Sequence, residues 1–176
     1  MTTPPIFGRL HPLFFPAPSE NDMSKIDIPA VPERKGSSYP TPFSEAVGAR
    51  IKQALGNAGG LTDFGVNLTR LPPDAWSSQR HWHTSEDEFV YILSGELTLI
   101  TDAGEQTLRT NDCAAFPKNV PDGHHLINRG SEMAVYLEIG TRSADPTCSY
   151  PDIDLHVDPK VGYQHKDGTP YARPAG

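Results

Sequence analysis

The sequence predicts an all-β protein, a jelly-roll barrel of two packed sheets with one short helix before it. From residue 61 onward, short extended segments alternate with turn signals such as Pro72-Pro73-Asp74 and Asp102-Ala103-Gly104. A chain of 176 residues can bury one core but is too short for two comfortable domains. About eight short antiparallel strands are typical of a double-sheet jelly roll. The expected strands are 61–71, 76–84, 88–94, 96–101, 105–108, 112–116, 124–128 and 133–140.

The first 40 residues are expected to form a proline-rich arm. Nine of the 18 prolines fall within the first 42 residues, and proline disfavours helix in the residue before it. Met23 is a plausible alternative start, so residues 1–22 are interpreted as an extension that is disordered or crosses to a neighbouring subunit.

A short helix is predicted at the start of the next region, residues 41–141, which also contains the barrel. Thr41-Pro42 has the form of an N-cap followed by proline at the first helical position. Apolar residues then recur at helical spacing, and glycines beyond residue 55 would end the helix. The apolar stripe consists of Phe43, Val47, Ile51, Ala54 and Leu55.

Two histidines on one predicted strand indicate a metal site. Side chains alternate along a strand, so His81 and His83 project to the same side, about 6 to 7 Å apart along the chain. Glu88 begins the next strand, which ends at Ser94-Gly95, where glycine can adopt the positive φ of a tight reversal. A further imidazole would come from His124 or its neighbour in the segment 123–128.

This pattern resembles the cupin superfamily. The first cupin motif reads G-x5-H-x-H-x3–4-E-x6-G, and this chain matches it from His81 to Gly95, with Ala75 in place of the opening glycine. The second motif reads G-x5-P-x-G-x2-H-x3-N. Here Asn111 and Asn119 replace its glycines, and two extra residues precede His124.

The two adjacent histidines compete for the fourth ligand position. The spacing from His124 to Asn128 fits the His-x3-Asn ending of the second motif, which favours His124. Neighbouring strand residues point to opposite faces, so His124 and His125 cannot both face one ion without a bulge. His125 is then either a neutral residue on the outer face, hydrogen-bonded or exposed, or a residue that contacts one of the metal-binding side chains or the substrate.

The resemblance implies one divalent transition metal bound by His81, His83, Glu88 and His124. Such a ligand set suits Fe, Mn, Zn or Ni and does not choose among them. A six-coordinate ion would keep two positions open for water, dioxygen or a chelating pair of substrate oxygens.

Three further polar residues, Gln79, Tyr136 and His125, are candidates for catalysis. Alternation backward from His81 places Gln79 on the ligand face, where it could orient a substrate. Tyr136 shares a face with Glu138, and the two could form a proton-transfer pair; His125 is the third candidate. Since Arg80, Arg109 and Lys118 are the only cations near the motifs and none is clearly inward, a substrate without phosphate fits at least as well as a phosphorylated one. 

The favoured function is a metal-dependent enzyme, an isomerase or lyase, that acts on a small oxygen-rich substrate such as a sugar, sugar acid or keto acid. The layout is similar to small bacterial cupins sometimes described as sugar-phosphate-isomerase-like. The alternatives are an Fe(II) dioxygenase and a non-catalytic cupin that binds or senses a small ligand. Fold alone does not choose among these functions.

Composition and charge bear on location and partners. The net charge of −7, without any lysine or arginine block, argues against nucleic acid or an anionic membrane as the main partner. No secretory signal or membrane-length apolar run is evident, so the protein is expected to be cytoplasmic. The family resemblance implies a homodimer. The tail, residues 142–176, is expected to pack on the barrel or on the dimer partner.

Overall fold

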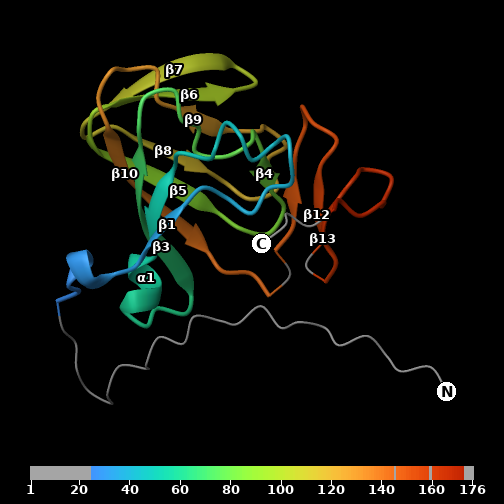
Figure 1. Ribbon diagram of the computed structural model, residues 1–176, viewed down its shortest axis with the longest axis horizontal. Helices are drawn as coiled ribbons and strands as arrows, with labels where there is room; N and C mark the ends of the chain where they lie inside the picture. Colours follow the sequence, from blue (N-terminus) through green and yellow to red (C-terminus); the bar gives the residue numbers. More distant parts are fainter. Residues whose placement is uncertain (1–24, 145, 159, 173–176) are drawn as a thin grey trace.

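A computed structural model of the chain describes residues 25–144, 146–158 and 160–172 (Figure 1). The expected extension at residues 1–22 lies outside these residues. The described part is mostly β-structure with one short α-helix, which confirms the predicted fold class. None of its helices has the length and apolar character needed to cross a membrane.

The larger wall of the barrel is an antiparallel sheet of six strands in the order β1-β2-β3-β10-β5-β8. Strands β3 and β10 pair along eight residues at its centre. Because successive side chains face opposite ways, each strand contributes alternate residues to the barrel interior. The strands are β1 (Glu33–Lys35), β2 (Ile51–Gln53), β3 (Phe64–Leu71), β5 (Glu88–Ser94), β8 (Cys113–Phe116) and β10 (Ala134–Thr141).

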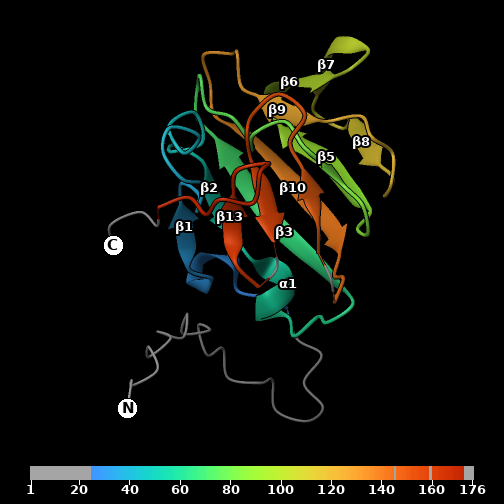
Figure 2. The ribbon, with the colours of Figure 1, turned by 90° about the vertical axis from the view of Figure 1, so that its right-hand side faces the viewer.

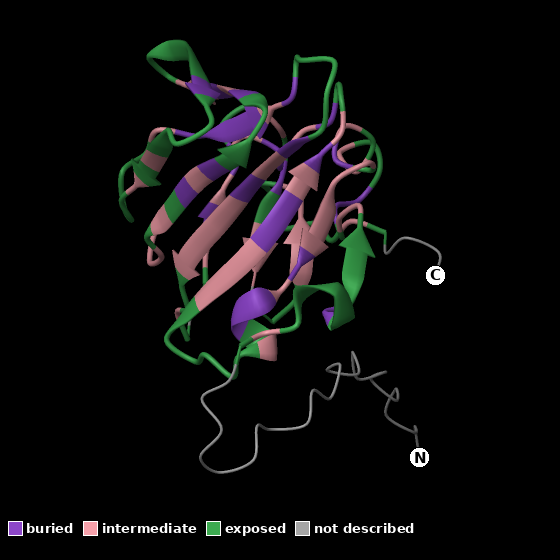
Figure 3. Ribbon diagram, turned by 90° about the vertical axis from the view of Figure 1, so that its left-hand side faces the viewer, coloured by how far each residue is buried: buried purple, intermediate pink, exposed green. Residues whose placement is uncertain are grey.

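The opposite wall is a sheet of three strands in the order β7-β6-β9. These strands are β6 (Glu96–Thr101), β7 (Gly104–Arg109) and β9 (His125–Ile127). Gly95 joins the two walls between β5 and β6 with φ of 80°, which confirms the predicted turn, and an added Cβ would lie 2.9 Å from Ala134 Cα. Side chains such as Ile92 and Leu97, both 0% exposed, fill the space between the walls. Exposed residues gather instead on β1 and on the outlying β7 (Figure 3).

The tail forms a third sheet that is joined to the barrel through strand β4 (Trp82–His83). Its order is β13-β12-β11-β4, and the tail strands are β11 (Cys148–Ser149), β12 (His156–Asp158) and β13 (Gly162–Gln164). Figures 1 and 2 place these strands beside the six-stranded sheet, on one side of the barrel. The Arg80 guanidinium attaches the tail further through Asp152, with Nε 2.6 Å from Oδ2.

The predicted helix at residues 41–55 is wrong. The turns at 41–49 are closed by hydrogen bonds between residues three apart, such as Gly48 N to Glu45 O, and β2 (Ile51–Gln53) pairs with residues 68–70 of β3. An isolated helix of this length is only marginally stable, whereas pairing with β3 satisfies the backbone groups of residues 51–53 within the sheet. The α-helix is α1 (Leu55–Ala58), which packs against β3, and a 3₁₀ turn precedes β1 at η1 (Ile28–Ala30).

The predicted strand at 76–84 is shorter than expected. Bends occupy residues 77–80, and regular pairing survives as isolated bridges at Trp76 and His81 and as β4 (Trp82–His83). The alternation of side chains therefore cannot be extended backward from His81. Because Gln79 lies in this bend, its side chain need not share a face with His81.

Candidate metal centre

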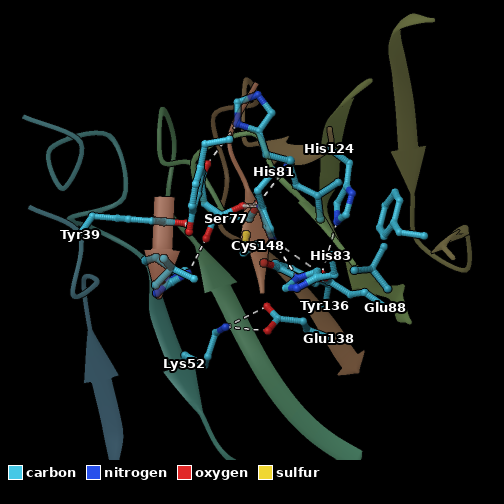
Figure 4. A pocket seen from close by; sticks show the side chains of 18 of the residues that line it. Tyr39, Lys52, Ser77, His81, His83, Glu88, His124, Tyr136, Glu138 and Cys148 are labelled. Carbon is cyan, nitrogen blue, oxygen red and sulfur yellow. Dashed lines mark hydrogen bonds and ion pairs between the residues drawn. The ribbon is translucent and has the colours of Figure 1, made fainter. Parts of the chain in front are cut away.

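Four side-chain atoms converge inside the barrel beside β4 and β5 (Figure 4). His81 Nε2 lies 3.2 Å from His83 Nε2, and Glu88 Oε2 lies 3.5 Å from His83 Nε2. The same carboxylate oxygen is 3.3 Å from His124 Nε2 and 4.0 Å from His81 Nε2. His81, Glu88 and His124 form a group of side chains that could hold one metal ion.

The strands explain how these residues meet. His81 and His124 are backbone partners, with His124 N donating to His81 O at 2.8 Å, so their side chains lie side by side. His83 follows two residues after His81, and Glu88 is the first residue of β5 in the adjoining wall. Residues from three separate segments thus share one small volume.

The separations between these atoms fit a single transition-metal ion. With bonds of about 2.1 Å, ligand atoms around one ion are about 3.0 Å apart when adjacent and about 4.2 Å apart when opposite. Four of the six separations among these atoms, from 3.2 to 4.0 Å, lie in this interval. The Nδ1 of His81 donates to the carbonyl oxygen of Gln79 at 2.8 Å, which leaves the Nε2 lone pair directed at the site.

The electrostatics of the group also suit a cation. Burial is the main effect on His81 and lowers its pKa to about 3, so the imidazole is neutral at physiological pH. Burial opposes ionisation of Glu88, but hydrogen bonds to His124 and His83 outweigh it, and the pKa of Glu88 is well below its ordinary value. Burial likewise disfavours a charged His83, yet contact with the Glu88 carboxylate raises the pKa of His83 overall. Metals bind neutral imidazoles and ionised carboxylates, so the forms favoured at His81 and Glu88 suit an ion, whereas a proton held by His83 would leave when the ion binds.

His124 and His125 have different environments. The His124 ring stacks on Phe116 with centroids 3.6 Å apart and points Nε2 at Glu88. The His125 Nδ1 donates to the Ser78 carbonyl at 3.1 Å, and its ring meets Trp76 edge-on. Only 5% of His125 is exposed and its ring borders the same cavity, so of the two alternatives for this residue the position beside the site, and not the outer face, agrees with the structure. The geometry brings His124, rather than His125, to the other three side chains.

The predicted role of Gln79 in orienting a substrate is not supported by its position. Its Nε2 donates to the backbone carbonyl of Phe43 at 2.7 Å, and the side chain does not line the cavity beside the histidines. The bends at 77–80 break the alternation on which the prediction rested. The contribution of Gln79 is its backbone carbonyl, which orients His81.

Tyr136 and Glu138 both line this cavity, as their spacing on one strand predicts. Burial raises the pKa of Tyr136 well above its ordinary value, so its hydroxyl stays protonated and cannot act as a base at neutral pH. Glu138 is ionically paired with Lys52, whose Nζ lies 2.7 and 2.9 Å from the two carboxylate oxygens.

Arg50 and Lys52 are cavity residues that the sequence interpretation missed. They were assigned to a helix, but their spacing of two, read as a strand, would have placed both on one face. Arg50 donates to the carbonyl oxygens of Ser77 and Gly36. The finding corrects the expectation that no cation near the site points inward.

The cavity beside the four converging side chains has a volume of about 270 Å³. Four tyrosines contribute to its lining, and the rings of Tyr39 and Tyr150 pack edge-on with centroids 5.8 Å apart. Of the charged residues that line it, two cations, Arg50 and Lys52, balance the two carboxylates, Glu88 and Glu138. A divalent ion would therefore give the lining a net positive charge, which favours an anionic ligand.

The fold and the site define a jelly-roll protein whose barrel holds a possible metal centre of histidines and a glutamate. A family model described as a cupin domain matches residues 67–140. The chain belongs to the cupin superfamily, as the sequence motifs predicted, and the predicted cupin fold is confirmed.

Solved structures show the same relationship in more detail. A sugar phosphate isomerase of the cupin superfamily from Silicibacter pomeroyi is 42% identical over 85% of this chain and 97% of its own, with a TM-score of 0.79. A protein from Acidithiobacillus ferrooxidans, provisionally described as a sugar phosphate isomerase, is 29% identical over 71% of this chain and 81% of its own, with a TM-score of 0.62. A polyketide cyclase from Streptomyces resistomycificus shares the fold at 15% identity and a TM-score of 0.54, with 68% and 80% of the two chains covered. A search of curated proteins finds no match.

Proposed function

We propose that the protein is a metal-dependent isomerase that acts on a small, anionic, oxygen-rich substrate such as a sugar phosphate or sugar acid. The observation that carries the proposal is the presence of a carboxylate–ammonium pair, Glu138 and Lys52, in the same cavity as the four candidate ligands. The similarity to proteins described as sugar phosphate isomerases supports the reaction class.

The candidate ligands fit a divalent transition metal, which when bound would polarise a carbonyl or hydroxyl oxygen of the substrate. Glu138 is placed to act as the base. Its carboxylate accepts hydrogen bonds from Lys52 and, at 3.2 Å, from Asn67 Nδ2, which fix its orientation in the cavity. In an aldose–ketose isomerisation it would take the proton from the carbon next to the carbonyl and return it to the former carbonyl carbon, while the hydroxyl proton moves to the former carbonyl oxygen.

The basic residues define the expected substrate chemistry. Lys52 forms an ion pair with Glu138, whereas the hydrogen bonds of the Arg50 guanidinium go to neutral carbonyl oxygens, and no carboxylate among the described residues pairs with it. An anionic group of the substrate would be attracted to this side of the cavity. A volume of about 270 Å³ suits a substrate of a few carbons.

The test is proton exchange in deuterated water. The metal-loaded protein is incubated without dioxygen with a panel of aldose and ketose phosphates and unphosphorylated sugar acids, and NMR measures deuterium entering the carbon next to the carbonyl. We expect exchange with at least one phosphorylated substrate, and a loss of about 100-fold or more in Glu138→Gln. The matched control is Glu105→Gln, whose carboxylate is exposed and pairs with Arg129.

The outcomes separate the functions considered. Exchange in the absence of dioxygen would show that the reaction does not consume dioxygen, which contradicts the dioxygenase alternative. Ligand binding without exchange across the whole panel would contradict an isomerase and favour a binding cupin. Full exchange in Glu138→Gln would contradict the assignment of the base.

A further inference from the structure

Cys148 lies beside the candidate metal centre, although it is far from the histidines in sequence. It is the first residue of β11, and its backbone partner across the strand pair is His83. Residues directly opposite one another in an antiparallel pair share a face, so the thiol and the imidazole point to the same side. The pairing is extended by the hydrogen bond from Thr84 N to Thr147 O at 3.3 Å.

The sulfur is within reach of an ion bound by the histidines. The Sγ of Cys148 and ring nitrogens of His81 and His83 all lie within 4.8 Å of one another. Two ligands on opposite sides of one ion, with bonds of about 2.3 Å to sulfur and about 2.1 Å to nitrogen, are about 4.4 Å apart. The limit of 4.8 Å exceeds this separation by a few tenths of an ångström at most, a difference that rotation of one side chain would cover.

His81 belongs both to this group and to the group with Glu88 and His124. Figure 4 shows the Cys148 sulfur next to His81 and His83, inside the cavity. The side chain is 7% exposed and forms no disulfide. The thiol therefore lines the same cavity as the other candidate ligands and is shielded from solvent oxidants.

We infer that Cys148 is a fifth protein ligand of the metal, supplied by the tail. The inference rests on the metal centre of the proposed function. When the sulfur–metal bond forms, the thiol proton is released to solvent, and one position of a six-coordinate ion stays open for substrate instead of two. A thiolate favours Zn, Fe or Co over Mn or Mg. Metal binding would also stabilise the docking of β11 against β4.

Cobalt(II) provides a direct test, because a cobalt–thiolate bond produces an intense charge-transfer band in the near ultraviolet that imidazole and carboxylate ligands do not. The full chain is stripped of metal, reduced and titrated with cobalt(II) without dioxygen. We expect one equivalent of cobalt and a charge-transfer band in the native protein and in Cys113→Ser. Cys113, the other cysteine, lies on β8 and is exposed, so this variant is the matched control.

In Cys148→Ser we expect the band to disappear and cobalt affinity to fall by about 10- to 100-fold, while one cobalt per chain still binds at high concentration. Cys148→Ala, checked by circular dichroism, repeats the measurement if the serine variant does not fold. One bound cobalt without the band in the native protein would refute the thiolate ligand and leave the histidine–glutamate centre intact. No bound cobalt would refute both.

Discussion

Replacing His124 and His125 one at a time tests the assignment of the fourth ligand. Only His124 points Nε2 at Glu88, at 3.3 Å, whereas His125 donates its Nδ1 to a backbone carbonyl. Loss of a ligand should weaken metal binding by about 100-fold or more, since even residues that merely orient ligands change affinity by about 10- to 100-fold. We expect this loss in His124→Ala and less than about a tenfold change in His125→Ala.

The size of the effect follows from binding linkage. Metal at about 1,000 times its dissociation constant stabilises the native protein by about 4.1 kcal/mol, and a 100-fold weaker site at the same concentration gives about 1.4 kcal/mol. For a chain of this size, 1 kcal/mol shifts the melting temperature by about 2–4 °C. Added metal should therefore raise the Tm by about 8–16 °C in the native protein and by about 3–6 °C in His124→Ala.

The assay is differential scanning calorimetry with and without one metal, combined with metal analysis of each variant. Comparing each variant with its own metal-free form removes the packing contributed by the His124 ring against Phe116. A native-like Tm rise in His124→Ala together with its loss in His125→Ala would reverse the assignment. Native-like rises in both variants would show that neither histidine binds the ion.

Three further predictions concern stability. Asn128→Ala should lower the free energy of unfolding by about 3 kcal/mol in urea titrations, because the fully buried side chain makes three hydrogen bonds to backbone groups; a change under 1 kcal/mol would count against this. Gly95→Ala should cost about 1–3 kcal/mol, since φ is 80° and the new Cβ would meet Ala134 Cα; unchanged stability would show that the turn can relax. Hydrogen bonding to Arg80 lowers the pKa of Asp152, so this pair stabilises the native protein above the unfolded carboxyl pKa of about 3.9 and loses its effect as pH falls through the lower native pKa. Asp152→Asn should therefore cost about 0.5–1 kcal/mol at pH 7, with the difference shrinking toward pH 2, and a difference independent of pH would contradict the pairing.

Much of the candidate metal centre was predictable because its signals are local. The spacing of two between His81 and His83 puts both side chains on one face, even though the regular strand β4 is only two residues long. Glu88 occupies its motif position as the first residue of the next strand, β5. The positive φ at Gly95 is likewise a property of one residue in a tight reversal. The choice of His124 followed from its spacing to Asn128, and the structure brings its ring to Glu88.

The errors came from segments whose structure depends on distant partners. Residues 51–53 have a helical pattern of apolar residues, but pairing with β3 makes them a strand and thereby turns Lys52 toward Glu138. Gln79 lies in a bend whose shape is set by contacts such as its own hydrogen bond to Phe43, so strand alternation misplaced it. Short segments have little intrinsic preference, and tertiary hydrogen bonds decide between their possible conformations.

The sequence by itself determined the fold class and the residues of the histidine–glutamate group, because both depend on side-chain alternation and on motif spacing within adjacent strands. Only the tertiary structure decided what surrounds that group. Arg50 and Lys52 reach the cavity from one edge of the large sheet, and Cys148 reaches it from the tail. These positions arise from pairing between strands that are distant in the chain, and no local pattern specifies which strand will lie beside which.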